Sequence, residues 1–150
     1  MQPEVIASAE KEFLRARKEL DQGNVLAALA YLERGLKIYD DPRWHSCLGF
    51  CIAKERGHVT RGLELCRLSL ERDPENGVHY LYLGRIHLVA GNKVEALKVL
   101  RQGMQIDDCP EIEQLLAAIG TRKPPVIAAL SRDNLLNKWL GFILNRLGIR

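Results

Sequence analysis

The sequence has no uninterrupted apolar run approaching the ~18 residues that cross a bilayer. Its first residues also lack the basic-then-apolar order of a secretory signal. Charge excess is small as well, because 22 Lys and Arg stand against 19 Asp and Glu, a formal net charge of +3. A nucleic-acid binder that relies on bulk charge would need far more. We therefore expect a soluble, cytoplasmic protein with no nucleic-acid partner.

Signatures of common enzyme active sites are missing too. The sequence contains no Gly-x-Ser-x-Gly elbow, no glycine-rich phosphate loop and no His-Glu-x-x-His motif. Among the histidines, His79 and His87 share a helix face only loosely, and no Asp or Glu is placed to orient either ring. We expect a protein without a catalytic site and without a cofactor.

The four cysteines do not form a metal-binding pattern. Cys47 and Cys51 are four residues apart and would share one face of a helix. A zinc site needs two further ligands at similar spacing, whereas Cys66 and Cys109 lie far along the chain. Without an export signal, reduced thiols are the expectation. We predict no metal site, and cysteines that behave as small buried hydrophobic residues.

What the sequence does contain is an internal period of 34 residues. Gly23, Gly57 and Gly91 are separated by that interval. The same spacing relates four further sets of mostly small or apolar residues: Ala28, Gly62 and Ala96; Leu32, Cys66 and Leu100; Gly35, Ser69 and Gly103; Leu36, Leu70 and Met104. Such a period is typical of repeat proteins in which each unit is one supersecondary element.

Each unit is predicted to be a pair of helices joined by a tight turn. Apolar residues recur at intervals of three, four and seven on both sides of each turn glycine, which is typical of helices with one buried face. Glycine followed by Asn or His suits a turn with positive φ. Pro42, Pro74 and Pro110 separate the units, because proline ends one helix and suits the start of the next. We therefore predict an all-α chain with no strand.

A helix–turn–helix period of this length resembles the tetratricopeptide repeat family. The third unit carries the motif best, as Tyr80-x2-Leu83-Gly84-x2-His87 followed by Ala96-x3-Leu100 and Gly103. The second keeps Leu48-Gly49-x2-Ile52 and Gly62-x3-Cys66, but with Trp44 one place early and one extra residue before Gly57. The first keeps Ala28-x3-Leu32 and has Arg15-Ala16 in place of Leu-Gly. The resemblance covers about residues 9–110 and implies a right-handed α-solenoid of three repeats.

These patterns divide the chain into a solenoid domain, residues 1–120, and a tail, residues 121–150. The repeats are predicted at about 9–41, 42–76 and 77–110, followed by a capping helix at 111–120 that covers the last repeat. In the tail, a proline-containing linker leads to an amphipathic helix. Its apolar stripe is roughly 200° wide, against the ~100° that a surface helix needs. The predicted contact face consists of Leu136, Trp139, Leu140, Ile143 and Leu147.

In the family, the first helix of each repeat lines a concave face. The resemblance therefore implies a partner-binding groove formed by Phe13, Arg17, Leu20, Phe50, Lys54, Leu81, Arg85, Leu88 and Val89. The same residues could instead pack against neighbouring helices or against the tail. Some family members clamp a terminal carboxylate with groove Lys and Asn side chains. The matching positions here hold Phe13, Arg17, Cys47, Val78 and Tyr82, which disfavours that specificity.

We expect a non-catalytic scaffold or adaptor that binds a helix or an extended peptide of a protein partner, oriented by Arg17, Lys54 and Arg85. One alternative is a self-assembling structural protein, a homodimer for example, whose C-terminal helix docks into its own groove or that of a neighbouring copy. Another is an adaptor that lies on a membrane surface through that helix. Its basic residues are spread out rather than clustered, so membrane association is not expected. No residue encodes the identity of the partner.

Overall fold

The computed structural model describes residues 2–120 together with Trp139, Phe142, Ile143 and Arg146. Residues 2–120 form seven α-helices and one short 3-10 helix, and no strand occurs among the described residues. The prediction of an all-α chain is confirmed for this part of the sequence. The chain divides into two compact units, residues 1–117 and 118–150.

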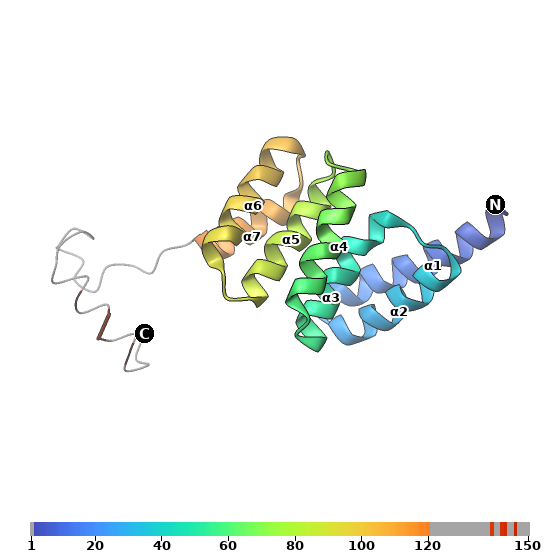
Figure 1. Cartoon of the computed structure of the whole chain (residues 1–150), viewed down its shortest axis with the longest axis horizontal. Coiled ribbons are helices and arrows are strands. Elements are labelled where there is room, and N and C mark those ends of the chain that lie inside the picture. The colour runs from blue at the N-terminus through green and yellow to red at the C-terminus, as the bar shows by residue number, and fades with distance from the viewer. Residues whose placement is uncertain (1, 121–138, 140–141, 144–145, 147–150) are drawn as a thin grey trace. The chain divides into compact units, whose positions relative to one another are not determined.

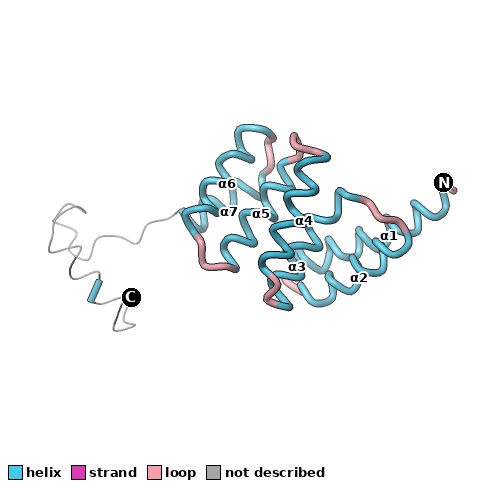
Figure 2. Tube along the Cα trace, viewed as in Figure 1, coloured by secondary structure: helices cyan, strands magenta, loops and turns pink. Residues whose placement is uncertain are grey.

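The helices of the first unit follow one another with short connections (Figure 1, Figure 2). Their bounds are α1 Pro3–Asp21, α2 Val25–Ile38, η1 Pro42–Trp44, α3 His45–Arg56, α4 Val59–Arg72, α5 Gly77–Val89, α6 Lys93–Ile106 and α7 Pro110–Gly120. The closest pairings are α1 with α2, α3 with α4 and α5 with α6, and α3 also lies against α2 and α5. Three helical hairpins therefore stack in chain order.

The turns inside the three hairpins have the same backbone geometry. Gly23, Gly57 and Gly91 have φ angles of 79°, 71° and 76°, and no other described residue has a positive φ. A side chain in this left-handed region is strained, which explains glycine at all three places. The 34-residue interval in the sequence thus corresponds to a structural equivalence at the turns.

Small residues bring the two helices of a hairpin close together. Ala28 and Ala96 are completely buried at equivalent positions of α2 and α6. In the middle hairpin, a Cβ placed on Gly49 of α3 would lie 2.6 Å from the carbonyl oxygen of Gly62 on α4, and the reverse distance is also 2.6 Å. The backbones of α3 and α4 are therefore in direct contact, which leaves no room for alanine at either position.

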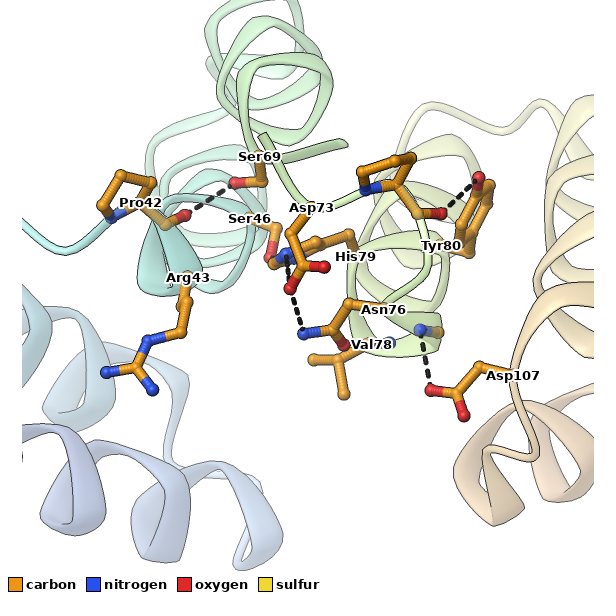
Figure 3. A network of polar contacts seen from close by, with 12 residues as sticks. Pro42, Arg43, Ser46, Ser69, Asp73, Asn76, Val78, His79, Tyr80 and Asp107 are labelled. Carbon is orange, nitrogen blue, oxygen red and sulfur yellow. Dashed lines mark hydrogen bonds and ion pairs between the residues drawn. The ribbon is translucent and has the colours of Figure 1, made fainter. Parts of the chain in front are cut away.

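Polar contacts brace the second and third hairpins internally, and one of them joins the two (Figure 3). In the second hairpin, the Ser69 hydroxyl of α4 donates to the Pro42 carbonyl oxygen at 3.0 Å. Between the second and third hairpins, Ser46 Oγ of α3 lies 2.8 Å from Nδ1 of His79 on α5. At the other end of the third hairpin, the backbone N–H of Gly77 donates to Asp107 Oδ2 at 2.9 Å. Of these bonds, the one between Ser46 and His79 joins α3 to α5 directly.

Most of the predicted tail lies outside the described residues, including the linker and Leu136, Leu140 and Leu147 of the predicted contact face. Trp139, Phe142, Ile143 and Arg146 are described as helical, and Trp139 and Phe142 are 62% and 65% exposed. Docking of this helix into its own groove or that of a neighbouring copy therefore stays a prediction. Within the described residues, no helix combines the length and the apolar character needed to cross a membrane.

Candidate functional site: a groove along the first helices

A cavity of about 560 Å³ opens along the first helix of each hairpin and is bounded by α7. Its size falls within the ~300–1,000 Å³ of typical ligand pockets. α1 contributes Arg17, Leu20 and Asp21, and η1 and α3 contribute Arg43, Trp44 and Cys47. Its remaining lining residues are Asn76, Val78, Leu81, Tyr82 and Arg85, at the start of and within α5, and Glu111, Gln114 and Leu115 of α7.

Helical periodicity explains why these residues point the same way. Val78, Leu81, Tyr82 and Arg85 are three or four apart, so they form one stripe on α5. The lining residues of α1 and α7 follow the same spacing. The lining thus combines arginine and carboxylate side chains with apolar ones, as in sites where a few polar groups orient a ligand.

Four of the predicted groove residues line this cavity: Arg17, Leu20, Leu81 and Arg85. Cys47, Val78 and Tyr82, which the family resemblance also placed at groove positions, line it too, whereas the sequence did not point to the remaining lining residues. Trp44 was displaced from the repeat motif because it ends the extra 3-10 turn that Pro42 begins. The residues of α7 were assigned to a capping helix, although Glu111, Gln114 and Leu115 show the spacing of a lining face.

The other predicted groove residues lie elsewhere. Phe13 is completely buried, and its ring stacks on Trp44 with the centroids 4.6 Å apart. Phe50 is buried with its ring centroid 5.8 Å from that of Tyr82. Both rings face the adjoining helices, because an aromatic side chain on the edge of a helix stripe buries more area there than in an open groove. Lys54 is exposed and, like Leu88 and Val89, is not part of the cavity lining.

Arg85 is held in place by aromatic rings rather than by an acidic partner. Its guanidinium carbon lies 5.6 Å from the ring centroid of Phe50 and 5.6 Å from that of Tyr82. Cation–π contacts of this kind orient the group without using its N–H donors. Among the described residues, the Arg85 side chain makes no ion pair and no hydrogen bond. Its donors are therefore available to a ligand.

Arg17 and Glu111 face each other from the two ends of the described unit. Arg17 Nη2 of α1 lies 3.6 Å from Glu111 Oε1 of α7, too long for a good hydrogen bond. The Glu111 carboxylate is held by its own backbone N–H and by Cys109, whose Sγ is 3.4 Å from Oε2. These bonds, together with the charges of Arg17 and Arg85, lower the pKa of Glu111 below its usual value.

Cys47 of α3 lines the same cavity as Arg17 of α1 and Arg85 of α5. The pKa of the Cys47 thiol is lowered because Cys51 donates a hydrogen bond to its sulfur. Burial opposes this effect, while Tyr82 and the charges of Arg85 and Arg17 reinforce it. The bond to Cys47 and burial raise the pKa of Cys51. The charges of Arg17 and Arg85 thus favour the anionic form of both Cys47 and Glu111.

Groups that suggest catalysis elsewhere do not form an accessible site. The expectation that no acidic residue lies near the His79 ring is wrong, because Asp73 Oδ2 is 3.8 Å from His79 Nε2, while Ser46 Oγ is 2.8 Å from Nδ1. Ser46 and His79 are 0% and 1% exposed and are outside the cavity lining, so no substrate reaches them. In the part of the chain that the structure describes, no three His, Cys, Asp or Glu side chains are grouped so as to hold a metal ion.

No family model matches this chain, and no curated protein matches it either.

Proposed function

We propose that this chain is a non-catalytic protein-interaction scaffold, built as a right-handed α-solenoid of three tetratricopeptide-like repeats. The cavity on the first helices carries the proposal, because it is the place where a partner segment can contact all three hairpins at once. The equivalent turns at Gly23, Gly57 and Gly91, together with the stacked hairpins, support the repeat architecture.

Binding would bury apolar side chains of the partner on the floor of the groove. Leu20, Trp44, Val78, Leu81 and Leu115 supply that floor. Burial of apolar surface provides most of the free energy of such associations, at about 25 cal/mol per Å². Four free, buried cysteines support a location in a reducing compartment such as the cytoplasm.

Selection from a library of short random peptides, displayed between two fixed flanking domains, tests this function. Val78→Trp should fill the groove and abolish binding of the selected peptides, because Val78 lines the cavity and its side chain is accessible. Val94→Trp is the matched control, since Val94 is 75% exposed on α6, outside the lining. If no peptide is enriched, or if both variants bind all enriched peptides as wild type does, the groove is not a binding site.

A second function, self-assembly through the C-terminal helix, is favoured by the exposure of Trp139 and Phe142. Large exposed apolar side chains on one helix usually mark an interface. Light scattering on the full chain and on a chain truncated after Gly120 separates the two functions. Self-assembly requires an oligomer for the full chain and a monomer for the truncated one.

A further inference from the structure

The arginines of the groove indicate what kind of segment it accepts. Arg17 and Arg85 both line the cavity, from α1 and α5, and neither guanidinium donates a hydrogen bond to another described residue. Arg43, the third arginine in the lining, differs from them because Asp41 accepts its Nε and Nη2 hydrogen bonds. Two guanidinium groups with unused donors at the edge of an apolar floor match a carboxylate set among apolar side chains.

Glu111 shows how a carboxylate is accommodated at this place. It lies in the electrostatic field of both Arg17 and Arg85, yet its contact with Arg17 is a 3.6 Å ion pair rather than a hydrogen bond. Its own hydrogen bonds come from α7 and from Cys109. A carboxylate on an incoming segment is free of that attachment, so it can approach the guanidinium groups at hydrogen-bond distance.

We propose that Arg17 and Arg85 together bind the carboxylate of an acidic side chain within the partner segment, and that Glu111 competes with it for Arg17. This inference rests on the proposed function of the groove. The segment would place apolar side chains beside the acidic one, over Leu81, Tyr82 and Leu115. Binding of the segment would break the ion pair between Arg17 of α1 and Glu111 of α7. The strength of that pair would therefore lower the affinity for the segment.

Charge also argues against the chain's own tail as the occupant. Residues 121–150 contain six basic residues and one acidic residue. Arg17 and Arg85 would repel such a segment, whereas they attract an acidic one.

The library selection described above tests the inference through the composition of the peptides it enriches. The peptides have no free C-terminus, so any carboxylate in them comes from a side chain. We expect enrichment of Asp or Glu flanked by apolar residues. For the best peptide, replacement of its acidic residue by the amide should weaken binding about tenfold, the size of a lost charge-assisted hydrogen bond.

Variants of the protein assign that effect to residues. Arg85→Gln and Arg17→Gln should each weaken binding about tenfold, with Arg85→Lys intermediate because an ammonium lacks the planar fork. Lys54→Gln removes the same charge from an exposed position outside the lining and should leave affinity unchanged. Glu111→Gln should raise affinity by about threefold or more, because the competitor for Arg17 loses its charge.

The outcomes separate the two proposals. Enriched peptides that bind in the groove but lack acidic residues overturn this inference and leave the proposed function intact. The same holds if Lys54→Gln weakens binding as much as Arg85→Gln does, or if a synthetic peptide of residues 121–150 displaces the selected peptides. Weaker binding to Glu111→Gln overturns the competition. Peptides whose binding Val78→Trp leaves unchanged overturn both proposals.

Discussion

Ser46 Oγ and His79 Nδ1 lie 2.8 Å apart and form a buried bridge between the second and third hairpins. The other ring nitrogen, Nε2, has no hydrogen-bond partner among the described residues, and Asp73 Oδ2 is 3.8 Å from it. His79 is 1% exposed, so a charge on its ring would be buried at the joint between two hairpins. The stability of that joint therefore depends on the neutral form of the ring.

Stability should fall as the pH drops below about 6.5, the usual pKa of an exposed histidine. Burial lowers the pKa of His79, although the charge of Asp73 opposes it. Between pH 6.5 and the lower pKa of the folded state, His79 is therefore protonated in the unfolded chain but neutral in the folded one. Urea denaturation from about pH 8 to about pH 5 should show a loss of at most about 1.4 kcal/mol per pH unit from this group.

His79→Gln should flatten this pH dependence, whatever its effect on stability at neutral pH. Burial lowers the pKa of His87 too, so His87→Gln should remove a second, separate part of the slope. His58→Gln, a replacement of an exposed histidine, serves as the control variant. An unchanged slope in His79→Gln would show that its ring titrates alike in the folded and unfolded chains.

Ala28→Leu should destabilise the first hairpin by about 1–3 kcal/mol, because the site of a fully buried alanine leaves no space for the larger isobutyl side chain of leucine. Ala96→Leu should do the same in the third hairpin. Ala30→Leu on the exposed side of α2 is the matched control and should lie within about 0.5 kcal/mol of wild type. Equal denaturation midpoints for Ala28→Leu and Ala30→Leu would contradict the assignment of Ala28 to the helix contact.

Cys47 should be the first thiol that iodoacetamide alkylates. It lines the cavity and its pKa is lowered. Burial raises the pKa of Cys66 and of Cys109. The hydrogen bond with Cys47, together with burial, raises the pKa of Cys51. The thiolate is the reactive species, so the order of modification follows the order of pKa and access. Arg85→Gln should slow the reaction at Cys47, since it removes a charge that favours the thiolate. Peptide mapping by mass spectrometry measures the rate at each site; earlier modification of Cys66 would refute the prediction.

The tail helix should be covered in solution, because its predicted apolar stripe is too wide to remain in water. Trp44 also fluoresces, so the measurement uses a Trp44→Phe background in which Trp139 is the single tryptophan. We expect blue-shifted emission from Trp139 and weak quenching by acrylamide. Emission like that of a free indole, together with unchanged stability after truncation at Gly120, would show a free helix.

The turns were predictable from sequence because a positive φ imposes glycine locally, so Gly23, Gly57 and Gly91 carry their own signal. The face of α5 was partly predictable, since Leu81 and Arg85 are four apart. Periodicity does not say which edge of a helix stripe meets the next helix. Phe13 and Phe50 were therefore predicted to line the groove, although both lie in the core. Glu111 was missed because its importance comes from a contact with Arg17, at the far end of the unit, which only the stacking of the hairpins produces.

The shared left-handed φ region of Gly57 and Gly91 has a consequence for how such a chain can change its length. A segment from one of these glycines to the next begins and ends in the same backbone state. Duplication of that segment would therefore create no new kind of junction and would insert one complete hairpin. Each insertion would lengthen the groove by one more first helix, about 8–10 Å, and would supply a fresh set of lining positions for mutation. The reach of the recognition surface could thus evolve in whole steps, independently of the chemistry at Arg17 and Arg85.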